Sequence, residues 1–226
     1  MGGRIGLFVA FLISLLFLYL IFYKGLLIFI KKTKAHEVTG NDLHYFAPLL
    51  KDLAHHYSFK KIRLFISQSH TPPLVWPELH DQLIVFINGE TLSQLNNSEK
   101  KIFAHLVLSH GQIQSKLARR FLGLLFISTY PIEKIFAPFF NLIGYLLGLN
   151  KEIYTADLKA LTLSQTSHFE FGLFLHKLHF LNYHTQNIFE GTYFFSILSK
   201  TDPKLYNLRF HPHIKYREKN ILGYSL

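Results

Sequence analysis

The sequence predicts an α+β fold, mostly helical with a small β-sheet, preceded by an N-terminal transmembrane helix. Three observations support this prediction: a long uncharged apolar run near the start, two short β-type runs, and apolar residues at helical spacing over most of the remaining chain. The chain has 226 residues, 49% of them apolar, which is enough for one membrane anchor and one globular domain. We therefore divide it into an anchor (1–34) and a domain (35–226).

The anchor prediction depends on residues 5–23, which carry no charge and are long enough to span a bilayer. The alternative is a signal peptide, but this run is long, its apolar character continues to Ile30, and it ends in lysines rather than in a small-residue cleavage site. Arg4 precedes the run, whereas four lysines follow it, so the positive-inside rule places the domain in the cytoplasm. These lysines are Lys24, Lys31, Lys32 and Lys34.

Composition excludes several kinds of site. The chain has no Cys, which rules out disulfides, thiolate metal sites and a thiol nucleophile. The formal net charge is +10, but residues 1–34 alone contain five basic and no acidic residues. Outside this segment no run of basic residues is interleaved with aromatics, so we expect no nucleic acid among the partners.

The domain begins with a predicted helix at 41–59, with Asn41 or Asp42 as its N-cap. Alternating apolar residues predict a strand at 61–67, and a short β-type run that ends at Gly89 predicts a second strand at 82–89. The proline-rich segment between them predicts a loop. Residues 90–95 could form a helical turn, after which Ser98 caps a helix from Glu99 to about Arg120. Further helices are predicted at 151–165, 168–184 and 190–200.

Residues 121–149 are almost wholly apolar, but two prolines and one charged pair divide them into pieces too short for ordinary transmembrane helices. We interpret them as a hairpin that dips into the bilayer or lies on it; the alternative is a buried hairpin of the domain. The interpretation predicts that its large apolar side chains contact membrane lipid or other integral membrane proteins. The predicted contact residues are Phe121, Phe126, Phe136, Phe139, Leu142 and Leu146.

Two histidines, His105 and His110, lie in the predicted helix "KKIFAHLVLSHGQIQSK" (100–116). In the zinc-protease motif HExxH the histidines are four residues apart and face one metal ion. Here they are five residues apart, about 140° around a regular helix. On their own, these two histidines therefore do not predict a shared metal ion.

Four segments in order resemble the HtpX-type membrane zinc metallopeptidases, which are related to the CAAX prenyl endopeptidases. They are "IRLFI" (62–66), "LIVFINGETLSQLNNSEKKIFAHLVLSH" (83–110), "IYTADLKAL" (153–161) and "RFHPHIKYREKNI" (209–221). Together they cover roughly residues 43–221. The resemblance implies a gluzincin-type metallopeptidase domain, in which His211 caps or braces the last helix.

The positions that do chemistry in that family are altered in this chain. The match places Leu106 on the first zinc histidine, Val107 on the catalytic glutamate and Ile153 on the third ligand. Of the four essential positions only His110 remains. The resemblance therefore implies a pseudopeptidase without catalytic residues, bound metal or other cofactor.

One alternative keeps a metal site. A one-residue π-bulge in each helix would let His105 and His110 converge, with Glu152 as the third ligand, although Leu106 would still replace the general base. His176 and His179 have a spacing that can chelate a metal, but no acidic ligand accompanies them locally.

Two function classes follow from these patterns. The lost ligands favour a catalytically inactive, membrane-anchored metallopeptidase homologue that acts as a scaffold or binding subunit of a membrane protein complex. The alternative is a zinc-dependent membrane endopeptidase with the displaced site.

Overall fold

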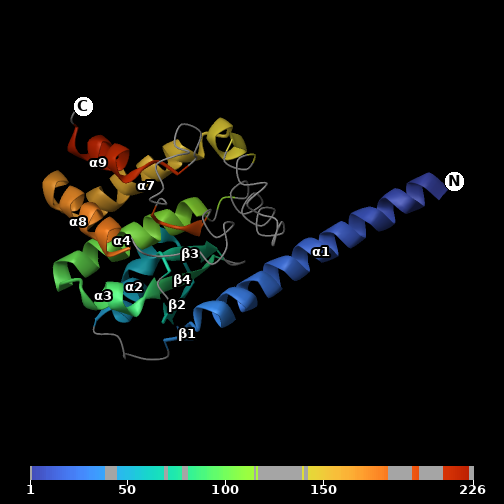
Figure 1. Ribbon diagram of the computed structural model, residues 1–226, viewed down its shortest axis with the longest axis horizontal. Coiled ribbons are helices and arrows are strands. Elements are labelled where there is room, and N and C mark those ends of the chain that lie inside the picture. Colours follow the sequence, from blue (N-terminus) through green and yellow to red (C-terminus); the bar gives the residue numbers. More distant parts are fainter. Residues whose placement is uncertain are drawn as a thin grey trace.

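The fold is built around a mixed four-stranded sheet in the order β1-β2-β4-β3. The computed structural model describes residues 2–38, 45–68, 71–77, 81–114, 116, 139, 142–182, 195–198 and 211–223. Strands β2 (Lys61–Ser67) and β4 (Gln82–Asn88) pair in parallel, and β1 (His36–Glu37) and β3 (Leu74–Pro77) add antiparallel edges. With helices making up most of the described chain, the α+β prediction is confirmed (Figure 1).

Both predicted strands are confirmed as β2 and β4, but β3 lies in the segment that was predicted to be a loop. The one proline in β3, Pro77, is tolerated because β3 pairs with only one neighbouring strand of the sheet, and an edge strand does not need every backbone N–H as a donor. Trp76 in this strand is 1% exposed. Burial of its side chain stabilises the strand although the local sequence has a low strand propensity.

The sheet is buried on both faces, and alternate residues of each strand contribute to different apolar clusters. Val85 and Ile87 of β4 belong to the larger cluster, together with residues of helices α2 (Phe46–Ala54) and α4 (Asn97–Gln114). Ile84 and Phe86 face the other way, into a cluster with Phe29 of α1 (Gly2–Thr33). Helix α4 is thus the central helix of the domain.

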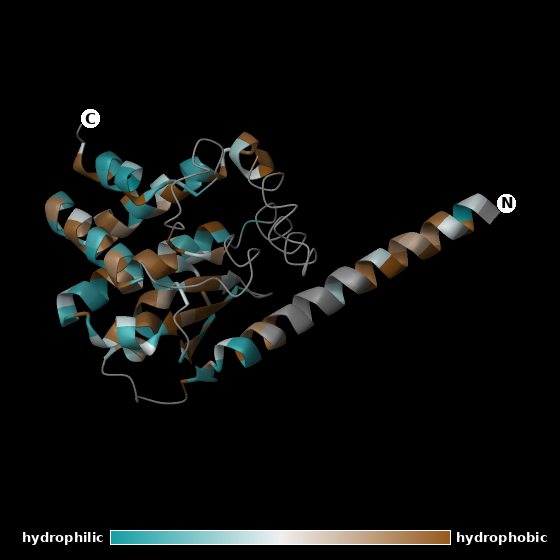
Figure 2. Ribbon diagram, in the orientation of Figure 1, coloured by the Kyte–Doolittle hydropathy of each residue, from teal (hydrophilic) through white to brown (hydrophobic). Residues whose placement is uncertain are grey.

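Helix α1 is a single helix of 32 residues whose two ends have different surroundings. Its last turns pack on the sheet, where the rings of Phe29 and Phe86 lie 4.9 Å apart, edge to face. Its N-terminal part extends away from all other elements and is rich in hydrophobic residues (Figures 1 and 2).

Among the helices in the described part of the chain, none was found to be long and apolar enough to cross a membrane. Within the predicted segment 5–23, the side chains at 17, 18 and 20–23 lie outside that part. The prediction of a transmembrane anchor is therefore not confirmed and stays a prediction.

Most predicted helices are present with shifted ends. The short helices are η1 (His55–Tyr57) and α3 (Gly89–Ser93), and the longer ones are α7 (Leu149–Ser164), α8 (His168–Leu181) and α9 (Ile214–Leu222). The cap of α4 was predicted wrongly: Asn96 and Glu99 exchange side chain to backbone hydrogen bonds, each 2.8 Å long, and so cap it in place of Ser98. Asn41 and Asp42 lie outside the described residues, and α2 follows Tyr45 without a side-chain cap.

The helix predicted at 190–200 is wrong over 195–198. Ser196 forms an antiparallel bridge with Leu74 of β3, and the amide of Ile197 donates to the carbonyl of Pro73 at 3.0 Å. Strand β3 lies at the edge of the sheet and has backbone groups free to pair, and residues 196 and 197 form hydrogen bonds there. Helical periodicity in the sequence does not show such pairing.

Candidate functional site

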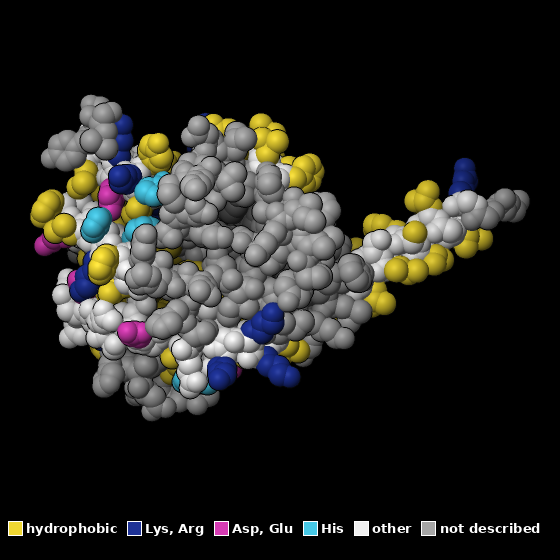
Figure 3. All heavy atoms as spheres, in the orientation of Figure 1, with side chains coloured by type: hydrophobic (Ala, Val, Ile, Leu, Met, Phe, Trp, Pro, Cys, Tyr) yellow, Lys and Arg dark blue, Asp and Glu magenta, His cyan; other side chains and the backbone are white. Residues whose placement is uncertain are grey.

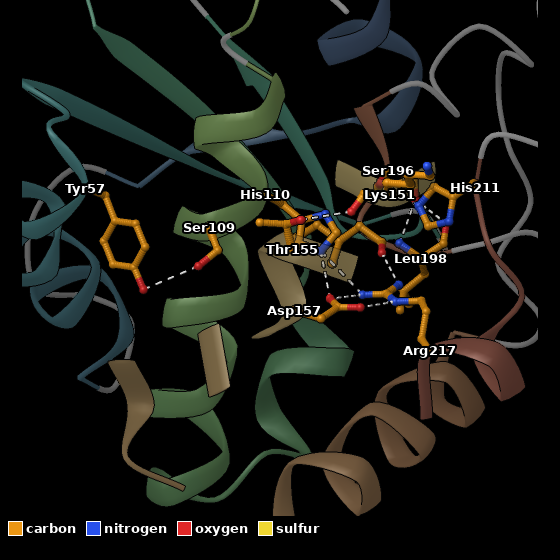
Figure 4. A network of polar contacts seen from close by, with 11 residues as sticks. Tyr57, Ser109, His110, Lys151, Thr155, Asp157, Ser196, Leu198, His211 and Arg217 are labelled. Carbon is orange, nitrogen blue, oxygen red and sulfur yellow. Dashed lines mark hydrogen bonds and ion pairs between the residues drawn. The ribbon is translucent and has the colours of Figure 1, made fainter. Parts of the chain in front are cut away.

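Three charged or polar side chains from three helices meet in the interior: His110 of α4, Asp157 of α7 and Arg217 of α9 (Figure 4). Each of them is 0% exposed. We call these residues the buried cluster. Arg217 Nε donates to Asp157 Oδ2 at 2.7 Å, and Arg217 Nη2 donates to Asp157 Oδ1 at 2.6 Å.

His110 lies against the same carboxylate. Its Nε2 is 3.1 Å from Asp157 Oδ1 and 3.4 Å from Arg217 Nη2. With the proton on Nε2, the ring donates to Asp157 and completes a second hydrogen bond on that oxygen. The carboxylate thus binds a guanidinium and an imidazole together.

The cluster also holds the 195–198 segment. Arg217 Nη1 donates to the carbonyl of Ile197 at 2.6 Å, and His211 Nε2 lies 3.1 Å from the carbonyl of Ser196. The prediction that His211 caps the last helix is wrong: His213 is the N-cap of α9 and accepts from the amide of Lys215, whereas His211 contacts residue 196.

The packing of the helices explains this convergence. Helix α4 crosses the domain centre and contacts α7 along its length, and α9 packs against α7 and α8. Asp157 therefore faces α4 from one side while Arg217 reaches it from the C-terminal helix. A buried carboxylate must be paired or neutral, and the bidentate arginine meets that requirement.

Electrostatics keep Asp157 ionised. Burial by itself raises the pKa of Asp157, but the charge of Arg217 and the hydrogen bonds from His110 and Arg217 outweigh it and lower the pKa to about 2. Asp157 is therefore ionised near pH 7 and pairs with the guanidinium of Arg217.

A second polar group lies on the other side of α4. Tyr57 Oη is 2.8 Å from His105 Nδ1, and Ser109 Oγ donates to Tyr57 Oη at 3.4 Å. Burial, with the nearby charges of Lys101 and His56, lowers the pKa of His105 to about 4. His105 is therefore neutral near pH 7, and its partner is Tyr57 rather than the buried cluster.

The structure does not bring the displaced metal site together. His105 contacts Tyr57, His110 contacts Asp157, and Glu152 pairs with Lys116. Helices α4 and α7 are regular α-helices without the π-bulges that this site requires. Over the described residues, no three His, Asp or Glu side chains are arranged to hold a metal ion.

The three residues that the resemblance aligns with lost zinc-site positions lie in the core. Leu106, Val107 and Ile153 are each 0% exposed. Aliphatic side chains carry no ligand atom and no general base, so these three positions themselves supply neither.

The remaining histidine pair, His176 and His179, contacts two different residues. His176 Nδ1 is 3.0 Å from Glu218 Oε1 on α9, while the ring of His179 lies 6.2 Å from that of His213. Both contacts join α8 to α9.

The pairing of Asp157 with Arg217 was missed at the level of sequence. Both residues lie in segments on which the resemblance depends, but the resemblance did not predict that the two side chains meet. A usable signal was present: Asp157 lies one turn from the apolar Ile153 and Ala160, and a carboxylate on an apolar helix face needs a buried cation.

No family model matches this chain, and no match was found among the curated proteins or the solved structures. The resemblance to HtpX-type peptidases therefore stays a prediction that depends on the four segments alone.

Proposed function

We propose that this protein is a membrane-anchored, catalytically inactive homologue of the HtpX-type metallopeptidases, which acts by contact as a scaffold or binding subunit of a membrane protein complex. Membrane lipid and other integral membrane proteins are the proposed partners. No cofactor is part of the proposal.

The buried cluster carries this proposal. The resemblance assigns His110 to a zinc ligand, and in this chain the imidazole lies beside a guanidinium and a carboxylate that neutralise each other. A cationic guanidinium 3.4 Å from His110 Nε2 disfavours a divalent cation at that nitrogen.

The apolar residues at the other family positions support the same proposal. A vacated polar cavity is stable only when it is filled, and Leu106, Val107 and Ile153 fill it with branched aliphatic side chains. A fold retained without its ligands is consistent with a role that depends on shape.

Membrane anchoring is supported by the sequence of 5–23 and by the exposure of α1. Large apolar side chains such as Leu7 (75%) and Phe8 (63%) are directed outward, where a lipid environment would cover them. The lysines after this segment favour a cytoplasmic domain.

The proposal is tested on the full chain purified in mild detergent and dialysed against metal-free buffer. We expect far less than one zinc per chain by elemental analysis, and no chelator-sensitive cleavage of unfolded casein. One zinc per chain, together with casein cleavage that a chelator abolishes, would overturn the proposed loss of catalysis.

A further inference from the structure

We infer that the surface formed by Phe139, Leu142, Leu146 and Leu147 rests in the interface of the bilayer that α1 crosses, as a second membrane contact of the domain. This inference rests on the proposed membrane anchor. We call these four residues the apolar patch.

The apolar patch is exposed in the structure. Leu146 is 73% exposed, and Phe139 and Leu147 are each 57% exposed. Residues 142–146 are helical, so Leu142 and Leu146 lie one turn apart on the same face. Several large aliphatic and aromatic side chains on one outward face are typical of helices that lie in a membrane interface.

The connection between α1 and the domain fixes how the domain is oriented. Helix α1 continues without a break from Gly2 to Thr33, and Phe29 near its end is 1% exposed within the sheet cluster. At 1.5 Å per residue, residues 5–23 extend over about 28 Å, close to the thickness of the hydrocarbon core. No flexible linker therefore separates the membrane segment from the domain, and the direction of α1 sets the membrane normal.

The direction of α1 selects the side of the domain that faces the bilayer. The segment at 142–150, yellow in Figure 1, lies on the side of the domain toward which the N-terminus of α1 projects, whereas α8 lies on the far side. The space-filling view has hydrophobic side chains over the same segment (Figure 3). The apolar patch is thus directed toward the membrane.

Charge at this end of the domain suits an anionic lipid surface. Lys31 and Lys34, at the end of α1, and Lys151, at the start of α7, have exposed side chains. Basic residues beside an apolar face add electrostatic attraction to anionic headgroups.

A comparison surface exists on α8. Leu173 is 55% exposed and Phe180 is 74% exposed, which closely matches Leu147 and Leu146, but α8 lies on the side away from the N-terminal part of α1 (Figure 1). Exposure and apolar character are therefore equal on the two surfaces, and only their position relative to α1 differs.

The chain has no Cys, so single cysteines allow site-specific spin labelling of the full protein. The test compares Leu146→Cys with Phe180→Cys, and Leu147→Cys with Leu173→Cys, in vesicles of phosphatidylcholine and phosphatidylglycerol. Accessibility to oxygen reports lipid, and accessibility to a water-soluble nickel chelate reports water. We expect labels at 146 and 147 to be at least threefold more accessible to oxygen than to the chelate, and labels at 173 and 180 to show the reverse.

A label introduced by Ser14→Cys separates failure of the inference from failure of the anchor. If the label at 14 is in lipid while those at 146 and 147 are as accessible to the chelate as their controls, the anchor stands and the inference is wrong. Shielding of 146 and 147 from both reagents would indicate contact with a second copy and would also overturn it. A label at 14 that is open to the chelate would contradict the anchor and the inference together.

Discussion

Arg217 and Asp157 are 60 residues apart in the chain, and their side chains form a bidentate ion pair in which neither group reaches solvent. The pair joins the C-terminal helix α9 to α7, and His110 connects it to the central helix α4. Docking of the last helix therefore depends on a charge pair in the protein interior.

The substitution Asp157→Asn should destabilise the protein by about 3–5 kcal/mol, because it leaves the guanidinium of Arg217 buried without its counter-charge. The change is measured as the free energy of unfolding in mild detergent. The double variant Asp157→Leu with Arg217→Met should recover most of the loss, because no buried charge remains. A double variant as unstable as the sum of its two single variants would contradict this account.

The matched control is the exposed pair of Lys60 and Asp81, whose side chains are 77% and 60% exposed. Asp81→Asn should leave the unfolding free energy unchanged within error, because solvent screens that pair and Asn tolerates the positive φ of 60° at this position. An equal loss at Asp81 and Asp157 would show that burial of the pair is not the cause.

Metal removal should not affect the fold. A structural metal makes stability depend on chelation, and the described interior is held by an ion pair instead. We expect the melting temperature of the full chain in excess EDTA to stay within about 1 °C of its value in added zinc. A melting temperature that falls by several degrees in EDTA and recovers on addition of zinc would contradict this prediction and support a metal site.

Stability should fall as the pH is lowered from about 6.5 to about 4, in part because of His105. Its folded-state pKa lies below the ordinary value, so the unfolded chain takes up the proton first and protonation favours unfolding over this window. Below pH 4 both states are protonated and the effect levels off.

The variant His105→Gln keeps an acceptor for Tyr57 but cannot titrate. Between pH 6.5 and pH 4 its free energy of unfolding should therefore fall by roughly 1–2 kcal/mol less than that of the wild type, after allowance for solvent screening. Thermal melts at pH 7, 5 and 4 measure the difference. Identical pH profiles for the two proteins would rule out His105 as a contributor.

Membrane topology follows from the lysines after residue 23. A reporter fused to the C-terminus that works only in the cytoplasm should be active, and one that works only after export should be inactive. The opposite pair of activities would reverse the proposed orientation.

Association with partners should not depend on the chemistry of His110. We expect the tagged full chain in mild detergent to co-purify with at least one integral membrane protein, and the variant His110→Gln to retain this protein despite a modest loss of stability. An unrelated single-pass protein with the same tag serves as the control. Loss of the partner in a variant that is still folded would contradict a contact role for the fold.

Local sequence patterns were sufficient for the regular elements of the core. The alternation at 61–67 and the β-type run at 82–89 predicted β2 and β4, and apolar spacing predicted α4, α7 and α8. Each apolar pattern fixes which face of its strand or helix is buried. The spacing of His105 and His110 likewise predicted that they face different directions, and their contacts with Tyr57 and Asp157 confirm it.

Tertiary structure alone decided the features that depend on partners distant in sequence. Strand β3 forms in a proline-rich segment because β4 offers a free edge and Trp76 is buried there, and residues 195–198 pair with β3 rather than coil into a helix. The charges of Asp157 and Arg217 could be read in the sequence, but their pairing could not, since it depends on how α4, α7 and α9 pack. A buried charge requires a partner, and only the packing of the whole chain determines which partner is within reach.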